Sequence, residues 1–151
     1  MATKNSAQRV IDAPAGEIFD FLSNPDRHAE TDGSGMVVSA DKAERITTVG
    51  QVFTMNMTKE DGDYQTRNEV FAVQENKVIG WKNLKNVTAE VSVGAKWLYE
   101  LESVDADHTR VTLTYDRSEI EDEAVRSMSE KFDDEFLERS LDSVAAAVAG
   151  S

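Results

Sequence analysis

Cysteine is absent from this chain of 151 residues, so disulfides, thiol catalysis and zinc sites built from cysteine are excluded. Histidine is nearly absent as well, because only His28 and His108 occur. Two histidines so far apart in the sequence do not make a set of metal ligands. We therefore expect no bound metal and no other cofactor.

Positive charge is also scarce, since 16 lysines and arginines face 29 aspartates and glutamates, for a net charge of −13. A surface this acidic repels phosphate backbones and anionic headgroups, so we expect no nucleic-acid partner. Long apolar runs are missing too. No segment approaches the roughly 18 apolar residues of a membrane-spanning helix, and the N-terminus has no signal-peptide pattern. The sequence therefore predicts a cytoplasmic protein without integral membrane association.

Repeats, low-complexity segments and linkers rich in proline, glycine or serine are absent. The length is near the commonest size of one domain and suffices to bury a core. We therefore predict a single domain over residues 1–151. The sequence does not distinguish a monomer from a homodimer.

The N-terminal part of the chain predicts a strand followed by two short helices. The strand covers residues 8–11, and Asp12 is expected to cap the first helix. Pro25 ends this helix, because the residue before a proline avoids the α region. A second short helix is predicted over residues 26–31. The apolar face of the first helix is formed by Ala15, Ile18, Phe19 and Leu22.

From Met36 to Tyr115 apolar and polar residues alternate, which is the pattern of antiparallel strands with one covered face. About six strands are predicted, with hairpin turns at Asp61-Gly62 and at residues 105–107. The residues expected to face inward are Phe53, Met55, Met57, Tyr64, Asn68, Val70, Ile79, Trp81, Trp97, Tyr99, Leu113 and Tyr115.

The end of the chain has apolar residues at steps of three and four, which predicts one helix of more than about 20 residues. Its inward residues include Met128, Phe132 and Phe136. Only the sheet offers an apolar surface broad enough for so long a helix. The order of elements therefore predicts an α+β fold, in which a curved antiparallel sheet of about six or seven strands wraps a long C-terminal helix.

Four characteristic segments follow one another along the chain: IDAPAGEIFDFLSNPDRHAETDGSG at 11–35, VGQVF at 49–53, KWLYEL at 96–101 and HTRVTLTYD at 108–116. Together they resemble the polyketide cyclase/dehydrase-like members of the START/Bet v 1 superfamily, also called SRPBCC. The resemblance spans almost the whole chain and implies the helix-grip fold, with a pocket between the sheet and the C-terminal helix. This superfold hosts lipid carriers, cyclases, hydrolases and co-chaperone-like domains, so the resemblance leaves the function open.

The pocket that the resemblance implies would be lined by the inward residues named above. Their apolar and aromatic side chains, with a few hydroxyls and one amide, have the make-up of a ligand pocket. Filling of a solid core is the competing interpretation, because periodicity does not reveal a void. The first hypothesis is therefore a protein that binds or transports a hydrophobic small molecule, either lipid-like or aromatic.

An enzyme of the cyclase or dehydratase type is the second hypothesis. Such an enzyme folds a reactive chain in a dry pocket and polarises a carbonyl with one or two polar groups. Tyr99, Tyr115 and Asn68 are weak catalytic candidates, because a buried tyrosine hydroxyl more often bonds to backbone or water. The third hypothesis is a non-enzymatic interaction or co-chaperone-like module, which an exposed apolar patch beside a filled core would favour.

The polar stretch NPDRHAETDGSG at 24–35 contains His28, Asp32 and Ser34, but it lacks the strand–turn–helix context of a nucleophile elbow. An exposed side chain is the favoured interpretation of His28. By the resemblance, the stretch lies at the cavity entrance, with His28, Thr31 and Asp32 as entrance residues. Thr31 stands where members of the family usually carry an aromatic residue.

Overall fold

The computed structural model describes residues 4–24, 27–28, 37–40, 45–59, 62–88 and 90–149. Over these residues the chain forms eight strands and three helices. In chain order they are β1 (Lys4–Ile11), α1 (Ala15–Leu22), β2 (Val37–Ala40), β3 (Val52–Lys59), β4 (Gly62–Gln74), β5 (Val78–Asn86), β6 (Val91–Ser92), β7 (Lys96–Asp105), β8 (His108–Asp116), α2 (Glu123–Ser129) and α3 (Asp134–Ala149). Among the helices of this described part, none is long and apolar enough to cross a membrane.

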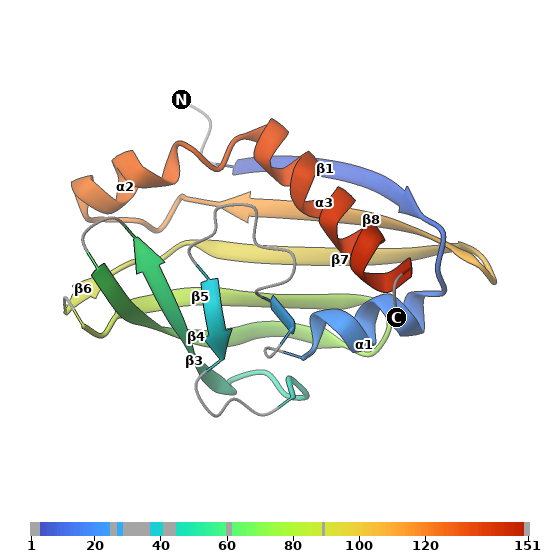
Figure 1. Ribbon diagram of the computed structural model, residues 1–151, viewed down its shortest axis with the longest axis horizontal. Coiled ribbons are helices and arrows are strands. Elements are labelled where there is room, and N and C mark those ends of the chain that lie inside the picture. Colours follow the sequence, from blue (N-terminus) through green and yellow to red (C-terminus); the bar gives the residue numbers. More distant parts are fainter. Residues whose placement is uncertain are drawn as a thin grey trace.

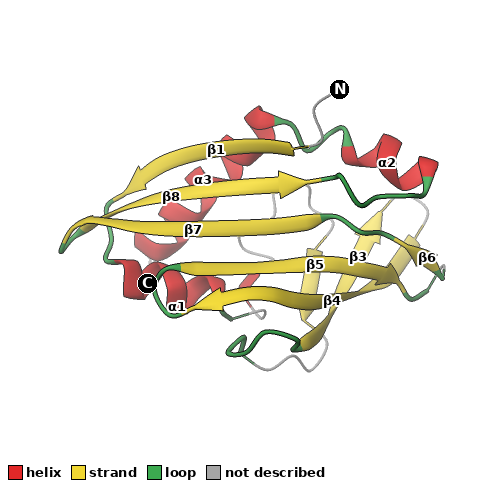
Figure 2. Cartoon of the chain, turned by 180° about the vertical axis from the view of Figure 1, so that it is seen from behind, coloured by secondary structure: helices red, strands yellow, loops and turns green. Residues whose placement is uncertain are grey.

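All strand pairs are antiparallel and join in the order β1-β8-β7-β5-β4-β3-β2, with β6 beside β5. The sheet is curved, and α3 runs along β1 and β8 (Figure 1). Seen from behind, the sheet lies in front of α1 and α3, so both helices cover the same face (Figure 2). We call this covered side the inner face. The predicted α+β helix-grip fold is thereby confirmed.

The core lies between the inner face and the two covering helices. Alternate residues of β8 are buried, as the sequence pattern predicts, and Val111 and Leu113 are fully enclosed. Helix α3 contributes Leu137, Leu141 and Val144, each at most 1% exposed. Since a slip of one residue would turn all these side chains outward, burial fixes the strand register.

The predicted single C-terminal helix is wrong, because the chain forms α2 and α3 with a break between Ser129 and Asp134. The carboxylate of Asp133 accepts a hydrogen bond from the backbone N–H of Phe136 at 2.9 Å. An aspartate in this position caps a new helix start instead of continuing the previous helix. The break lets Phe132, between the two helices, reach aromatic side chains of the sheet.

The N-terminal elements also differ from the sequence-based prediction in their bounds. Strand β1 begins at Lys4, because its whole length pairs with β8. Asp12 does not cap α1, whose N-cap is Pro14 without a side-chain hydrogen bond. The buried face of α1 consists of Ile18, Phe21 and Leu22, so Phe21 was missed.

The end of α1 differs from the prediction, and most of the second predicted helix lies outside the described residues. Helix α1 ends at Leu22, before Pro25 is reached, and Ser23 is its C-cap. Of the predicted helix over 26–31, only Arg27 and His28 are described, and they form a 3₁₀ turn.

Candidate functional site

The inner face carries large apolar side chains with different degrees of burial. Val70 and Ile79 are fully buried, and Phe53 and Met55 are nearly so. Other large side chains on this face or on the segment that covers it stay half-buried and keep part of their surface accessible: Met57, Tyr64, Trp81, Trp97 and Phe132. Cross-strand pairing places Met57 beside Tyr64 and Trp81 beside Trp97. The half-buried set is thus spread over β3, β4, β5, β7 and the link between the helices.

Four aromatic rings form one cluster where α3 begins. The centroids of Trp97 and Tyr115 are 4.2 Å apart, and Phe132 stands edge-on to both, at 5.4 and 5.3 Å. Phe136, from the first turn of α3, lies 4.8 Å from Phe132. Offset and edge-to-face pairs of this kind add stability beyond their buried area.

A second cluster surrounds Trp81 and includes the predicted entrance residue His28. The imidazole of His28 stacks on the indole of Trp81 at 4.7 Å with an interplanar angle of 18°. Its Nε2 donates to the backbone carbonyl of Leu22 at 2.9 Å. His28 is therefore half-buried against the inner face, and the expectation of an exposed side chain is wrong. The other two entrance residues, Thr31 and Asp32, lie outside the described residues.

A row of polar groups crosses the apolar inner face. The indole N–H of Trp97 donates to Asn83 Oδ1 at 3.0 Å, and Asn83 Nδ2 donates to Asn68 Oδ1 at 2.5 Å. Asn68 Nδ2 donates in turn to the backbone carbonyls of Phe53 and Thr66, at 3.4 and 3.3 Å. We call the three side chains of Trp97, Asn83 and Asn68 the amide relay. Its bonds give each of the two amides partners on a face where an unpaired polar group is costly to bury.

Asn83 is the residue of this site that the sequence reasoning missed. It continues the two-residue period of Ile79 and Trp81, so the signal was present. The segment directly before β7 holds its backbone, because the Asn83 N–H donates to the carbonyl of Ala95 and the Asn83 carbonyl accepts from the N–H of Gly94, each at 2.7 Å. The pairing of β4 with β5 has a bulge between Arg67 and Asn68. Because of this bulge, Asn83 lies opposite Asn68.

Both tyrosines that were predicted as catalytic candidates are buried. Tyr115 is 2% exposed, and burial raises the pKa of its hydroxyl, against opposing effects of the Arg117 charge and a hydrogen bond with Ser129. The hydroxyl of Tyr115 therefore keeps its proton throughout the neutral range. Tyr99 is 7% exposed, and its ring lies 5.9 Å from that of Trp81.

Nearly all sequence-predicted ligand residues are brought to one side of the molecule. Those that are buried or half-buried on the inner face or on its covering segment are Phe53, Met55, Met57, Tyr64, Asn68, Val70, Ile79, Trp81, Trp97, Tyr99, Leu113, Tyr115, Phe132 and Phe136. Met128 departs from the predicted inward orientation, because it is 39% exposed on α2. The split of the C-terminal helix is the reason, since α2 does not continue the axis of α3 (Figure 1).

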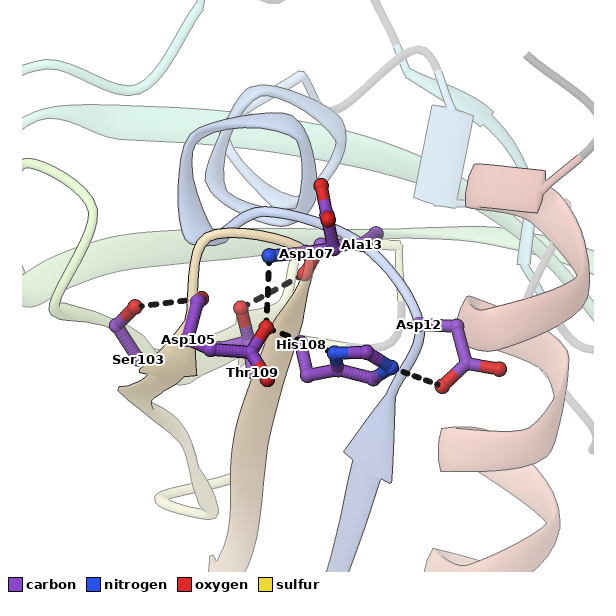
Figure 3. A network of polar contacts seen from close by, with 7 residues as sticks. All are labelled: Asp12, Ala13, Ser103, Asp105, Asp107, His108 and Thr109. Atoms are coloured by element: carbon purple, nitrogen blue, oxygen red, sulfur yellow. Dashed lines mark hydrogen bonds and ion pairs between the residues drawn. The ribbon is translucent and has the colours of Figure 1, made fainter.

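His108 forms a separate polar contact at the turn between β7 and β8 (Figure 3). Its Nδ1 lies 2.7 Å from Asp105 Oδ1, and its Nε2 lies 3.4 Å from Asp12 Oδ1. The hydrogen bond to Asp105 raises the pKa of the imidazole above its usual value and lowers the pKa of that carboxyl. The neighbouring Thr109 hydroxyl donates to the carbonyl of Ala13 at 2.8 Å. These contacts tie the β1–α1 connection to the hairpin.

A hollow of about 640 Å³ is lined by described residues away from the predicted ligand residues. Its lining includes the charged side chains of Lys77, Glu100, Glu102 and Arg110. Among the described side chains, no group of three or more histidines and carboxylates is arranged to hold a metal ion. The aromatic and amide arrangement of the inner face is therefore the stronger candidate for a functional site.

The chain matches proteins with the same fold. The sequence pattern of the family described as activator of Hsp90 ATPase homolog 1-like protein (AHSA1) matches residues 12–148. The uncharacterized protein Rv0088 of Mycobacterium tuberculosis is 33% identical over 106 residues, which cover 70% of this chain and 44% of that protein. The chain thus spans less than half the length of this curated relative.

Solved structures support the same fold at low sequence identity. A protein from Arthrobacter aurescens superposes with a TM-score of 0.74 at 16% identity, covering 99% of this chain and 88% of that one. The aromatase/cyclase ZhuI from Streptomyces sp. R1128 superposes with a TM-score of 0.69 at 14% identity, covering 97% and 93%. With the family match, these findings confirm that the chain has the fold of the SRPBCC proteins that its sequence resembles.

Proposed function

The chain belongs to the AHSA1 family of activator of Hsp90 ATPase homolog 1-like proteins, and we propose that it binds a hydrophobic small molecule against the inner face of its sheet. The ligand is lipid-like or aromatic, and it lies between the sheet and α3. Carriage or sequestration of such a molecule is the function that this arrangement favours.

The observation that carries the proposal is the half-buried state of large side chains on the inner face. Met57, Trp81, Trp97 and Phe132 each keep part of an apolar surface accessible. Covering such surface gains about 25 cal/mol per Å², so a ligand that contacts several of these side chains binds favourably. Methionine and aromatic side chains also adapt to ligands of varied shape.

The cyclase alternative receives less support from the same residues. ZhuI is described as an aromatase/cyclase, but at 14% identity its likeness to this chain shows the fold alone. A general acid or base needs a pKa near neutrality and contact with the substrate. Tyr115 is buried with a raised pKa, so it fits a packing role better than a proton-transfer role.

Binding of an apolar dye, combined with a matched pair of variants, tests the proposal. Nile red is expected to gain fluorescence with the wild-type chain, and native mass spectrometry of freshly purified protein is expected to show a retained small molecule. Met57→Glu places a charge on the inner face and should weaken dye binding about tenfold or more. The control Val10→Glu lies on the exposed side of β1, where the residue is 43% exposed, and should leave dye binding unchanged.

Two results of the dye-binding experiment would contradict the proposal. Equal dye affinity in the wild-type chain and in Met57→Glu would place the dye elsewhere on the molecule. A wild-type chain that binds neither the dye nor any retained molecule would have a solid core, and the proposal would then be wrong.

A further inference from the structure

The amide relay has a direction that its two ends impose. The indole N–H of Trp97 can only donate, so Asn83 presents its oxygen to Trp97 and its amino group to Asn68. At the other end, backbone carbonyls can only accept, so Asn68 presents its amino group to Phe53 and Thr66. Neither amide can turn over without losing hydrogen bonds at both of its ends.

This arrangement leaves one amide hydrogen to spare. An asparagine amino group has two hydrogens, and Asn68 Oδ1 takes one of those on Asn83. Across the part of the chain that the structure describes, the second has no acceptor within hydrogen-bond distance. Asn68 is 1% exposed, whereas Asn83 is only half-buried. The spare donor therefore belongs to the relay member that a ligand can reach.

The surroundings of the Asn83 amide make its second N–H group a good donor to a neutral oxygen atom. Acceptance from the indole at 3.0 Å draws electron density away from the Asn83 nitrogen, which strengthens its N–H groups. The inner face that carries the relay is rich in apolar side chains, and a hydrogen bond is stronger in such surroundings than in water. A carboxylate would lose its hydration in this setting and would also meet the net charge of −13. One donor in an apolar wall suits a neutral carbonyl oxygen on a hydrocarbon body.

We propose that Asn83, oriented by Trp97 and Asn68, is the residue that recognises the polar atom of the ligand. The ligand class is then an apolar molecule that carries a ketone or a similar neutral carbonyl group. This inference rests on the proposed function, because it assigns the specific polar contact made on the same inner face.

Two probes of nearly equal shape separate this contact from general apolar binding. 2-Acetylnaphthalene carries a carbonyl oxygen where 2-ethylnaphthalene carries hydrogens. Isothermal titration calorimetry on the full chain measures the dissociation constant of each probe. For the wild-type chain we expect the ketone to bind about tenfold more tightly, because one well-placed hydrogen bond in apolar surroundings produces a difference of this order.

Three variants locate the origin of that preference. Asn83→Leu removes the donor at similar size and should bring the ratio of the two dissociation constants to about one. Trp97→Phe keeps an aromatic ring but releases the Asn83 amide from its fixed orientation, so the ratio should fall as well. Trp81→Phe is the matched control, since Trp81 lies on the same face outside the relay. It should weaken both probes by the same factor and keep the ratio.

The ratio is the readout because a purely structural role of Asn83 would weaken both probes alike. Equal affinity of the wild-type chain for the two probes overturns the assignment and leaves ligand binding intact, and so does an unchanged ratio in Asn83→Leu. Failure of the wild-type chain to bind either probe overturns the proposed function together with this inference. Should Asn83→Leu not fold, because Asn68 loses its donor, Trp97→Phe decides by the same ratio.

Discussion

His108 shows how one contact can couple charge to local structure. The imidazole lies between Asp105 and Asp12 and joins the β7–β8 turn to the β1–α1 connection (Figure 3). In an NMR titration of the wild-type chain, we expect His108 to titrate above 6.5, because the hydrogen bond to Asp105 is the largest cause of its raised pKa. Asp105→Asn should return the midpoint toward 6.5, and His108→Gln identifies the resonance. A wild-type midpoint at or below 6.5 would contradict the contact.

The same contact gives folding stability a defined pH window. The pKa of His108 is raised in the folded chain and that of Asp105 is lowered, from usual values of 6.5 and 3.8. The stabilisation is therefore complete between those values. It is lost as the pH rises through the raised pKa of His108 or falls through the lowered pKa of Asp105. Since the side chains of His108 and Asp105 are 43% and 57% exposed, high salt should reduce the stability difference between wild type and Asp105→Asn.

Single residues on the inner face were largely predictable from alternation, while their contacts were not. Phe53, Trp81 and Tyr115 face inward as their spacing predicts. Asn83 obeys the same spacing. Its segment contains both polar and apolar residues, however, and the sequence does not indicate which residue Asn83 contacts across the sheet. The relay depends on a bulge between β4 and β5, and a bulge leaves no periodic signal in the sequence.

At the scale of elements, the break between α2 and α3 decides how the inner face is covered. The first turn of α3 depends on the Asp133 carboxylate, which accepts from the N–H of Phe136 at 2.9 Å. Asp133→Ala should lower the free energy of unfolding by about 1 kcal/mol in urea denaturation, the usual loss for a helix cap. The exposed mid-helix control Glu138→Ala should change it by less than about 0.5 kcal/mol. Equal effects of the two substitutions would show that Asp133 does not act as a cap.

The apolar spacing alone could not reveal this break. Val125, Phe132 and Phe136 keep helical intervals across it, so the pattern reads as one continuous helix. The break arises from a short-range competition in which an aspartate side chain replaces a backbone acceptor. Asp12 is the opposite case. Aspartate is a residue type that commonly caps helices, but Asp12 contacts His108 and does not cap α1.

For the whole molecule, the order of elements was sufficient to predict a curved sheet with a C-terminal helix across it. Burial of one face fixes the register of the long strands. The fold could therefore be predicted correctly even though the predicted strand bounds were inexact. The start of β1 at Lys4 depends on pairing with β8, which is distant in the sequence, so local pattern did not predict it. The strand β6 pairs locally with the end of β5, but it is too short to show a two-residue period. Whether side chains leave room for a ligand is likewise a property of packing in three dimensions.

Methionine methyl groups provide the most direct test of ligand binding at the inner face. Of the five methionines, Met55 and Met57 lie on this face, whereas Met128 is exposed on α2. With ¹³C-methyl-labelled methionine and saturating 2-acetylnaphthalene, we predict intermolecular nuclear Overhauser effects between the probe and the methyls of Met55 and Met57. Effects at Met128 alone, or at none of the three, would contradict binding at the inner face.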